Sequence, residues 1–315
     1  MSLPSPERGP GIAYSRSVRI AVIVNRRAGT VVSEGLDAEA LQRIFRNAGV
    51  EADVRLLPGE EIEAATREAV AGGAEVVVAG GGDGTIRTVA SVLVEERVPM
   101  GVLPVGTLNH FARDLGIPTE LPEAVRVLVT GTVRALDVAE VNGEVFVNNS
   151  ILGFYPPVVR VRDWQRRRLE RGKWWATLTA AFKVLPKLPS LHVRLKADGL
   201  EIDHKTRFVF VGNNEYEFHA FRYGARCRFD SGSLYIYIDK SRTRLGLLAV
   251  ALLGLVRDVK RTDRFERWQL PELTIETRKK AVPVYLDGEV TVMNPPLRYR
   301  TRPLALRVLL PSSGT

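Results

Sequence analysis

The chain has 315 residues, about twice the usual domain size of roughly 100 to 200 residues, so we expect two domains. Hydrophobic residues make up 45% of the chain and charged residues 26%, and the 27 glycines and 18 prolines follow no three-residue period, which excludes collagen-like and disordered classes. The one cysteine, Cys227, excludes a disulfide framework and a cysteine-rich zinc site and favours reducing cytosol. A net charge of +9 favours phosphate-bearing partners, namely a nucleotide, nucleic acid or anionic lipid.

Strands and helices alternate in the first part of the chain. Continuous β-branched runs such as VRIAVIV at 18–24 are typical of strands buried on both faces of a parallel sheet. The alternation with helical segments predicts βαβ units, and therefore an α/β domain over 18–134 with a parallel sheet. The predicted strands are 18–24, 52–57, 74–80 and the start of 100–107, and the predicted helices are 36–48, 60–71, 85–95 and about 120–130.

From about residue 135 the pattern changes, because strand-like segments now follow one another. This density of strands predicts a mainly antiparallel β-sandwich over 135–310, whose last strand could return to the first domain. The predicted strands are 136–141, 145–150, 191–196, 207–212, 233–238, 273–277, 282–286 and 304–310, and helical inserts are expected at 173–185 and 245–260.

The two ends of the chain and its longest apolar run indicate whether the chain has a signal peptide or a membrane-crossing segment. Residues 1–17 are polar and proline-rich and lack the apolar centre of a signal peptide, so we expect a flexible arm there and a short tail at 311–315. The apolar run 245–256 is shorter than the roughly 20 residues that cross a bilayer. It is either a helix buried against the second domain or an element at a membrane surface.

The most informative loop is GGGDGT at 80–85, which follows a predicted strand and opens a predicted helix. Glycines leave backbone N–H groups accessible and the helix N-terminus adds partial positive charge, so this loop can bind a polyphosphate. Asp83 would repel phosphate, so it is expected to hold Mg²⁺ or to orient a loop amide. The alternative is an ordinary strand-to-helix turn.

A second loop and a tight turn complete the candidate site. In 103–118, Gly106 permits close backbone approach, and Thr107 and Asn109 offer polar contacts at the neighbouring carboxyl edge of the sheet, where such folds bind ligands. The sequence LDGE at 286–289 is typical of a β-hairpin turn. In a functional interpretation, one of its carboxylates accepts a hydroxyl proton and the other holds a metal ion or a loop.

These motifs occur together in a known order. GGDGT (81–85), PVGTLNHFARDLGIP (104–118) and LDGE (286–289), with NRRAG at 25–29 and FVNNSILGF at 146–154, resemble the diacylglycerol kinase catalytic domain family, which includes bacterial lipid kinases and sphingosine kinases. The likeness runs from about residue 18 to 310. GGDGT is shared with NAD kinases, and the 104–118 block is what indicates a lipid kinase.

The resemblance implies an enzyme that uses ATP and Mg²⁺ to phosphorylate a lipid hydroxyl, with ATP on the α/β domain, the lipid on the β-sandwich domain and the active site between them. It implies Asp287 as general base, with Glu289 and Asp83 as further catalytic residues. The implied nucleotide-binding residues are Asn25, Gly29, Gly81, Gly82, Gly84, Thr85, Gly106, Thr107 and Asn109, and the implied metal ligands are Asp83, Asp137, Asp230 and Glu289.

The chain departs from the family pattern at two positions. His110 stands where many members have an aspartate, and Asp230-Ser231-Gly232 stands where Asp-Asp-Gly is usual. Each departure removes one carboxylate from a place where the family has it. The metal arrangement is therefore left open by the sequence, while the expected base, Asp287, is present.

A basic segment suggests where the enzyme acts. Residues 160–173 carry seven positive and two negative charges, and Trp164, Trp174 and Trp175 lie in or beside them, which is typical of contact with an anionic membrane surface. The alternative is a solvated helix with core tryptophans. We therefore expect a cytoplasmic enzyme, peripherally bound at the inner face of the membrane.

Other functions and partners were weighed against a lipid kinase. The alternatives are a kinase of a soluble substrate such as NAD and a catalytically silent lipid- or nucleotide-binding protein. Aromatic residues make up only 7% and no RNA-binding motif is present, so nucleic acid is not expected as a partner. The particular lipid and the oligomeric state stay open, and a homodimer is compatible with the sequence.

Overall fold

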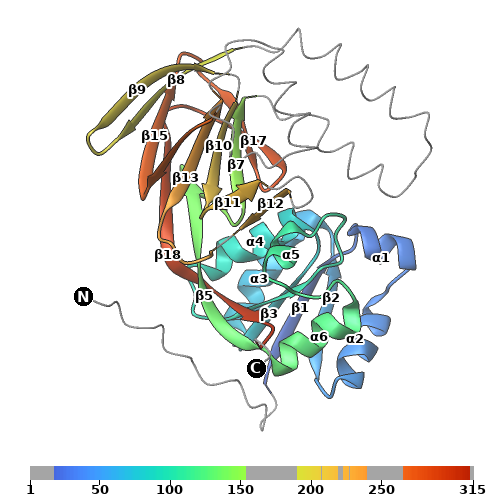
Figure 1. Cartoon of the computed structure of the whole chain (residues 1–315). Helices are drawn as coiled ribbons and strands as arrows, with labels where there is room; N and C mark the ends of the chain where they lie inside the picture. The colour runs from blue at the N-terminus through green and yellow to red at the C-terminus, as the bar shows by residue number, and fades with distance from the viewer. Residues whose placement is uncertain are drawn as a thin grey trace, which may run out of the picture. The chain divides into compact units, whose positions relative to one another are not determined.

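The computed structural model describes residues 18–153, 190–206, 208–218, 223–226, 228–239 and 265–312 (Figure 1). The chain divides into two compact units, one formed by Met1–Leu136 and Leu304–Thr315 and the other by Asp137–Pro303. The predicted inserts at 173–185 and 245–260 and the basic segment at 160–175 lie outside the described residues. Within the part that is described, no helix is long and apolar enough to cross a bilayer.

The first unit is built on a parallel sheet. Strand β1 (Ile20–Asn25) pairs with β2 (Ala52–Leu57) on one side and β3 (Val76–Gly80) on the other, and β4 (Met100–Leu103) pairs with β3. The end of β18 (Leu297–Leu310) pairs in parallel with β4. β1 and β3 are almost wholly buried, as continuous apolar strands of a sheet covered on both faces should be. The predicted α/β class is confirmed.

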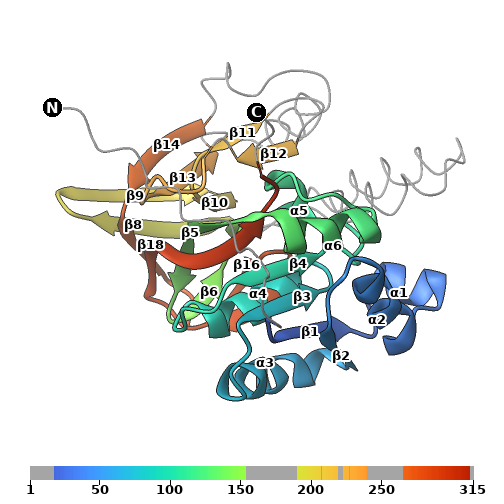
Figure 2. The same ribbon diagram turned by 90° about the horizontal axis from the view of Figure 1, so that it is seen from below.

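Helices cover both faces of this sheet. α2 (Ala38–Asn47) packs beside α6 (Leu121–Thr130) on one face, and α3 (Ile62–Ala71) packs beside α4 (Asp83–Leu93) on the other (Figures 1 and 2). Two short helices, α1 (Gly29–Glu34) and α5 (His110–Asp114), and a 3₁₀ turn, η1 (Gly59–Glu61), occupy loops. The sequence did not predict α1, because six residues are too few to show a helical period.

The second unit is a sandwich of antiparallel strands around one core. One sheet has six strands in the order β14-β13-β10-β7-β16-β17, and the other contains β15, β8 and β9 together with β5, β6 and the first part of β18. Side chains of both sheets form the buried core, including Val209 and Val284 from the first and Val193 and Ile275 from the second. The predicted β-sandwich is confirmed.

The strands of this unit have the following bounds: β5 Thr132–Val141, β6 Glu144–Phe146, β7 Asn149–Gly153, β8 Leu191–Ala197, β9 Leu200–Thr206, β10 Phe208–Asn213, β11 Tyr216–Phe218, β12 Tyr223–Arg226, β13 Leu234–Asp239, β14 Phe265–Leu270, β15 Glu272–Thr277, β16 Val282–Leu286 and β17 Glu289–Met293. β11 and β12 pair with each other in a separate two-stranded sheet.

Two strand predictions need correction. The predicted strand 145–150 is interrupted by a bend at Val147 and Asn148, whose N–H groups donate to a side chain, Asp287, instead of to a neighbouring strand. The predicted last strand begins at Leu297 rather than at 304, because β18 continues through a distortion at Leu304, where φ is +51°. The first correction matters for function, since the bend lies beside the expected base.

Candidate active site

Three loops of the first unit meet at the carboxyl ends of β1, β3 and β4. The N–H of Thr30 donates to the carbonyl of Val105 at 2.9 Å, and the N–H of Gly81 donates to the carbonyl of Leu103 at 3.2 Å. The amide Nδ2 of Asn25 lies 3.3 Å from Oγ1 of Thr85. The segments with the expected nucleotide-binding residues therefore lie side by side.

Glycines allow these loops to pack backbone against backbone. A Cβ on Gly106 would lie 2.2 Å from the Cα of Gly82, and a Cβ on Gly29 would lie 2.9 Å from Oγ1 of Thr107. A Cβ on Gly81 would lie 2.4 Å from the Cβ of Thr85. All three distances are too short for a Cβ, so an alanine at Gly106 would push two loop backbones apart, whereas an alanine at Gly29 or Gly81 would displace the side chain of Thr107 or Thr85. By contrast, a Cβ on Gly82 would make an ordinary contact of 3.7 Å.

Asp83 joins the first glycine loop to the second loop. It is the first residue of α4, only 8% exposed, and its carboxylate accepts the N–H of Phe111 at 3.0 Å and that of His110 at 3.2 Å. These donors begin α5, so Asp83 caps that helix from a neighbouring loop. The His110 Nδ1 lies 3.3 Å from the same carboxylate. Of the two expectations for Asp83, the structure shows the second, which is to orient loop amides.

The environment of Asp83 also changes its acidity. Burial by itself would raise the pKa of this carboxyl, but the hydrogen bond and charge of the His110 side chain and the two N–H donors outweigh burial, so the pKa lies below its ordinary value of 3.8. Because the folded pKa is depressed, the carboxylate stabilises the fold above pH 3.8, and this contribution is lost as the pH falls through the folded pKa.

Asn109 braces the second loop from within. Its φ of +53° is a left-handed conformation that asparagine tolerates better than most residues. The side chain is 5% exposed, and Nδ2 donates to the carbonyls of Pro104 at 2.8 Å and Gly106 at 3.0 Å. Oδ1 is buried and has no hydrogen-bond partner among the described residues. Asn109 therefore holds the shape of the loop, whereas Thr107 is exposed at its surface.

In the second unit, Asp287 occupies the predicted hairpin turn. Leu286 pairs with Glu289 across a two-residue loop, and both loop residues have positive φ, +50° at Asp287 and +92° at Gly288. This is the geometry in which Asp-Gly is favoured. Asp287 is 9% exposed, whereas Glu289 is exposed on the edge strand β17.

The Asp287 carboxylate is held by the bend between β6 and β7. It accepts the N–H of Val147 at 2.8 Å, of Asn148 at 2.7 Å and of Asn149 at 3.0 Å, and the N–H of Asp287 donates to the carbonyl of Asn149 at 3.0 Å. Hydrogen bonds to an ionised carboxylate are short and strong. We call Val147–Asn149 the strap, because it fixes the expected base in one orientation.

Asp137 lies in the same network. Its N–H donates to the carbonyl of Phe229 at 2.7 Å, and its Oδ2 accepts the N–H of Gly232 at 2.7 Å. Asn213, which is wholly buried, donates to the carbonyls of both Asp137 and Val147. Asp230 instead pairs with Arg228 at the surface. The structure thus connects Asp137 to the strap through Asn213, which the sequence analysis missed.

The sheet that carries Asp287 has a largely buried cluster of aromatic side chains on one face. Tyr285 pairs with Ile151, Ile151 with Phe210, and Phe210 with Tyr237, so these side chains form a row across β16, β7, β10 and β13. Tyr216 packs into the same cluster, with its ring centroid 5.2 Å from that of Phe210. We call this set the aromatic row. Two residues of strand, roughly 7 Å, separate Tyr285 from Asp287.

Comparison with known proteins identifies the family of the chain. The model of the diacylglycerol kinase catalytic domain matches residues 19–141. A protein of Pseudomonas aeruginosa named "probable lipid kinase YegS-like" is 32% identical over 284 residues, covering 85% of this chain and 88% of the relative, and a protein of the same name from Pseudomonas fluorescens is 30% identical over 273 residues, covering 85% and 89%. The chain belongs to the family of diacylglycerol kinases and YegS-like lipid kinases.

Solved structures agree on the fold. A diacylglycerol kinase from Bacillus anthracis strain Sterne superposes with a TM-score of 0.66 at 20% identity, covering 93% of this chain and 97% of that one. The relatives at 32% and 30% identity confirm the family resemblance inferred from the sequence, and with it membership of a kinase family.

Three of the expected metal ligands have other partners in the structure. The Asp83 carboxylate accepts backbone N–H groups, Asp137 accepts the N–H of Gly232, and Asp230 pairs with Arg228. Among the described residues, no three His, Cys, Asp or Glu side chains gather in a way that could hold a metal ion. A role of these carboxylates toward Mg²⁺ stays a prediction from the family resemblance.

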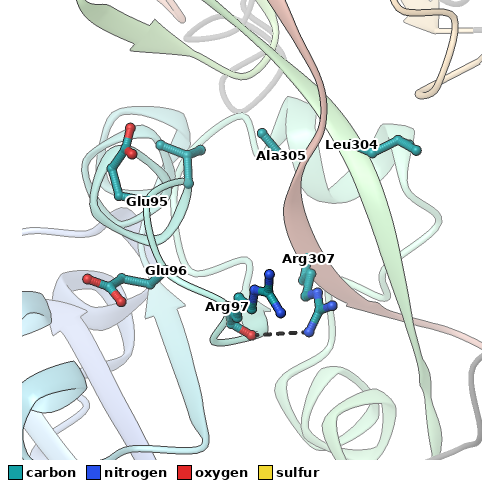
Figure 3. Close-up of a pocket in the computed structure, with 7 residues that line it drawn as sticks. Glu95, Glu96, Arg97, Leu304, Ala305 and Arg307 are labelled. Atoms are coloured by element: carbon teal, nitrogen blue, oxygen red, sulfur yellow. Dashed lines mark hydrogen bonds between the residues drawn. The ribbon is translucent and has the colours of Figure 1, made fainter.

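A cavity elsewhere in the first unit is distinct from the loops. It has a volume of about 410 Å³ and lies between the chain that follows α4 and the end of β18 (Figure 3). Glu95 and Glu96 line one side, and Arg97 and Arg307 lie together on another, where Arg307 donates to the carbonyl of Arg97 at 3.4 Å. It adjoins the C-terminal end of α4, whereas the glycine loop is at the N-terminal end. None of the expected site residues lines this cavity.

Proposed function

We propose that this family member is an ATP-dependent lipid kinase, which transfers the γ-phosphoryl group of ATP to the hydroxyl of a lipid alcohol such as diacylglycerol. In this proposal the loops of the first unit bind the triphosphate, and the second unit supplies Asp287 and the surface for the lipid. The relatives are named as lipid kinases and a solved neighbour as a diacylglycerol kinase, and these names support a lipid acceptor.

The proposed triphosphate-binding site is formed by the three loops that meet in the first unit. The helix α4 begins directly after the glycine loop, with Gly82 as its N-cap, so its N-terminal partial positive charge faces the place where the three loops meet. Gly82 tolerates a Cβ sterically, so its glycine is not explained by packing. A close approach of the backbone to phosphate oxygens would explain it.

The observation that carries the lipid assignment is the apolar surface beside Asp287. Val290, which pairs with Tyr285, and Val292 are 54% and 69% exposed, and Tyr285 is half-buried, whereas Phe210, Tyr216 and Tyr237 are buried behind Tyr285 in the aromatic row. An acceptor whose hydroxyl reaches Asp287 is therefore proposed to contact these exposed apolar side chains, which suit an acyl chain better than a soluble nucleotide.

The chemistry asked of Asp287 is modest. A carboxylate is too weak a base to deprotonate an alcohol in advance, but in a loose, metaphosphate-like transition state the hydroxyl loses its proton late. The hydroxyl oxygen forms the new bond to the γ-phosphorus, the bond from the γ-phosphorus to the bridging oxygen of ADP breaks, and the carboxylate takes the proton. The three N–H groups of the strap keep the carboxylate oriented for that role. Mg²⁺ is proposed to arrive bound to ATP.

The test is direct. The protein is incubated with γ-labelled ATP, Mg²⁺ and, separately, diacylglycerol, monoacylglycerol, a sphingoid base and phosphatidylglycerol in detergent micelles, and label in organic-extractable product is measured and identified by mass. We expect one lipid to be labelled. Transfer to NAD instead would make the protein a soluble-substrate kinase, and no transfer to any acceptor would indicate a silent binding protein.

Two variants separate catalysis from folding. Asp287→Asn keeps the size of the side chain and should lower turnover by about 10² or more, the range in which general base catalysis contributes. Asp203→Asn, a half-exposed aspartate of the same unit that pairs with Arg194, is the matched control and should keep wild-type turnover. Retention of turnover within about tenfold by Asp287→Asn removes Asp287 from the base role.

A further inference from the structure

Arg226 carries a buried charge next to the strap. It ends β12 and is 7% exposed. Its Nη1 donates to the carbonyl of Val147 at 2.6 Å, its Nη2 donates to Oδ1 of Asn148 at 3.0 Å, and its Cζ lies 4.6 Å from the centroid of the Phe229 ring. A buried guanidinium costs free energy unless it is hydrogen-bonded and paired, so its contacts indicate what it does there.

One peptide group connects Arg226 to Asp287. The carbonyl of Val147 and the N–H of Asn148 belong to the same planar unit. Arg226 donates to that oxygen, and the N–H donates to Oδ1 of Asp287 at 2.7 Å. A cation and an anion thus lie at opposite ends of a single peptide dipole. Hydrogen bonds in such a chain polarise one another, so the cation strengthens the N–H donor that holds the carboxylate.

A neutral donor shares the same oxygen. Nδ2 of Asn213 donates to the carbonyl of Val147 at 3.0 Å. This second bond keeps the carbonyl hydrogen-bonded when Arg226 is replaced. The strap can therefore persist in an Arg226 variant while losing the positive charge, which makes the effect of the charge measurable.

We propose that Arg226 is a positioning residue, which acts through the peptide group between Val147 and Asn148 to fix the Asp287 carboxylate for the acceptor hydroxyl. This inference rests on the proposed function, because it assigns Asp287 the role of base. Arg226 touches neither ATP nor lipid in this role. Its loss should therefore lower kcat and leave the KM values for both substrates nearly unchanged.

The kinetic test uses diacylglycerol in detergent micelles with labelled ATP. Arg226→Met should lower kcat by about tenfold or more, a part of the contribution of general base catalysis, with the KM for ATP within about twofold of wild type. The kcat of Arg226→Lys should lie between those of wild type and Arg226→Met, because lysine keeps the positive charge but cannot donate two hydrogen bonds in the geometry of a guanidinium. Arg194→Met, which removes a half-exposed arginine of the same unit, is the control and should behave as wild type.

A double-mutant cycle tests whether Arg226 acts through Asp287. Added to Asp287→Asn, Arg226→Met should cause no further fall in kcat, because both changes disable the same carboxylate. Equal fold-losses in the two backgrounds would overturn the inference, as would a large rise in the KM for ATP with kcat unchanged, which would make Arg226 a nucleotide ligand.

A measurement without turnover tests the physical link itself. Amide hydrogen exchange of the full chain should speed up at Asn148 and its neighbours in the strap in Arg226→Met, with β10 and β16 as protected as in wild type. Unchanged exchange at the strap overturns the inference. If wild-type protein phosphorylates no lipid, the proposed function fails instead, and the exchange result still decides whether Arg226 fixes the Asp287 carboxylate.

Discussion

Replacing Gly106 by alanine separates the packing role of the glycines from phosphate binding. The new Cβ would lie 2.2 Å from the Cα of Gly82 and 2.6 Å from its nitrogen, whereas ordinary contacts begin near 3.4 Å, so the two loops must part by about 1 Å. Both contacts are with backbone, which cannot rotate away as a side chain can. Overpacking of this kind typically costs about 1–3 kcal/mol.

The assay is thermal unfolding together with nucleotide binding. For a unit of this size, each kcal/mol lowers the melting temperature by about 2–4 °C, so Gly106→Ala should melt about 2–12 °C below wild type. Gly82→Ala, whose Cβ would make an ordinary contact of 3.7 Å, should have the melting temperature of wild type. It should bind ATP more weakly if the loop contacts phosphate. A Gly106→Ala protein that melts with wild type would refute the reasoning from loop packing.

Asp83→Asn should lower the free energy of unfolding at neutral pH, because the folded pKa of Asp83 is depressed. The difference in unfolding free energy from wild type should shrink as the pH falls below 3.8, which denaturant unfolding at a series of pH values measures. A difference that stays constant with pH would contradict this prediction. Tyr285→Ser should raise the KM for micellar diacylglycerol and spare that for ATP, whereas the control Asp203→Asn should leave both KM values at those of wild type; equal effects of Tyr285→Ser on both substrates would count against the aromatic row. Vesicles rich in anionic lipid should co-sediment the full chain at low salt and release it at high salt; absence of binding at low salt would remove the membrane role of the 160–175 segment.

The sequence alone determined the architecture of both units. Runs such as 20–24 and 76–79 are apolar on every residue, and this pattern is typical of a parallel sheet covered on both faces. The Asp-Gly turn at 287–288 follows from local backbone preference, and the structure shows it in the predicted register. These features depend on residues a few positions apart, which is why a pattern reveals them.

The sequence also predicted correctly that the glycine loop and the second loop lie beside one another. It did not show what holds them together. It predicted that 80–85 and 103–118 share the carboxyl edge of a sheet, as they do. It left open whether Asp83 holds a metal ion or orients loop amides, and only the distances to His110 and Phe111 showed the amide contacts. That these loops and Asp287 serve one triphosphate stays a prediction.

Tertiary structure alone decided how Asp287 is held. The bond from Val147 to Asp287 joins residues 140 positions apart, and the bond from Arg226 to Val147 joins residues 79 apart. No local period or motif records such pairs, because each partner by itself looks like an ordinary strand or loop residue. The sequence therefore named Asp287 as the expected base, while only the fold showed that its carboxylate accepts the N–H groups of the strap and that Arg226 donates to the carbonyl of Val147.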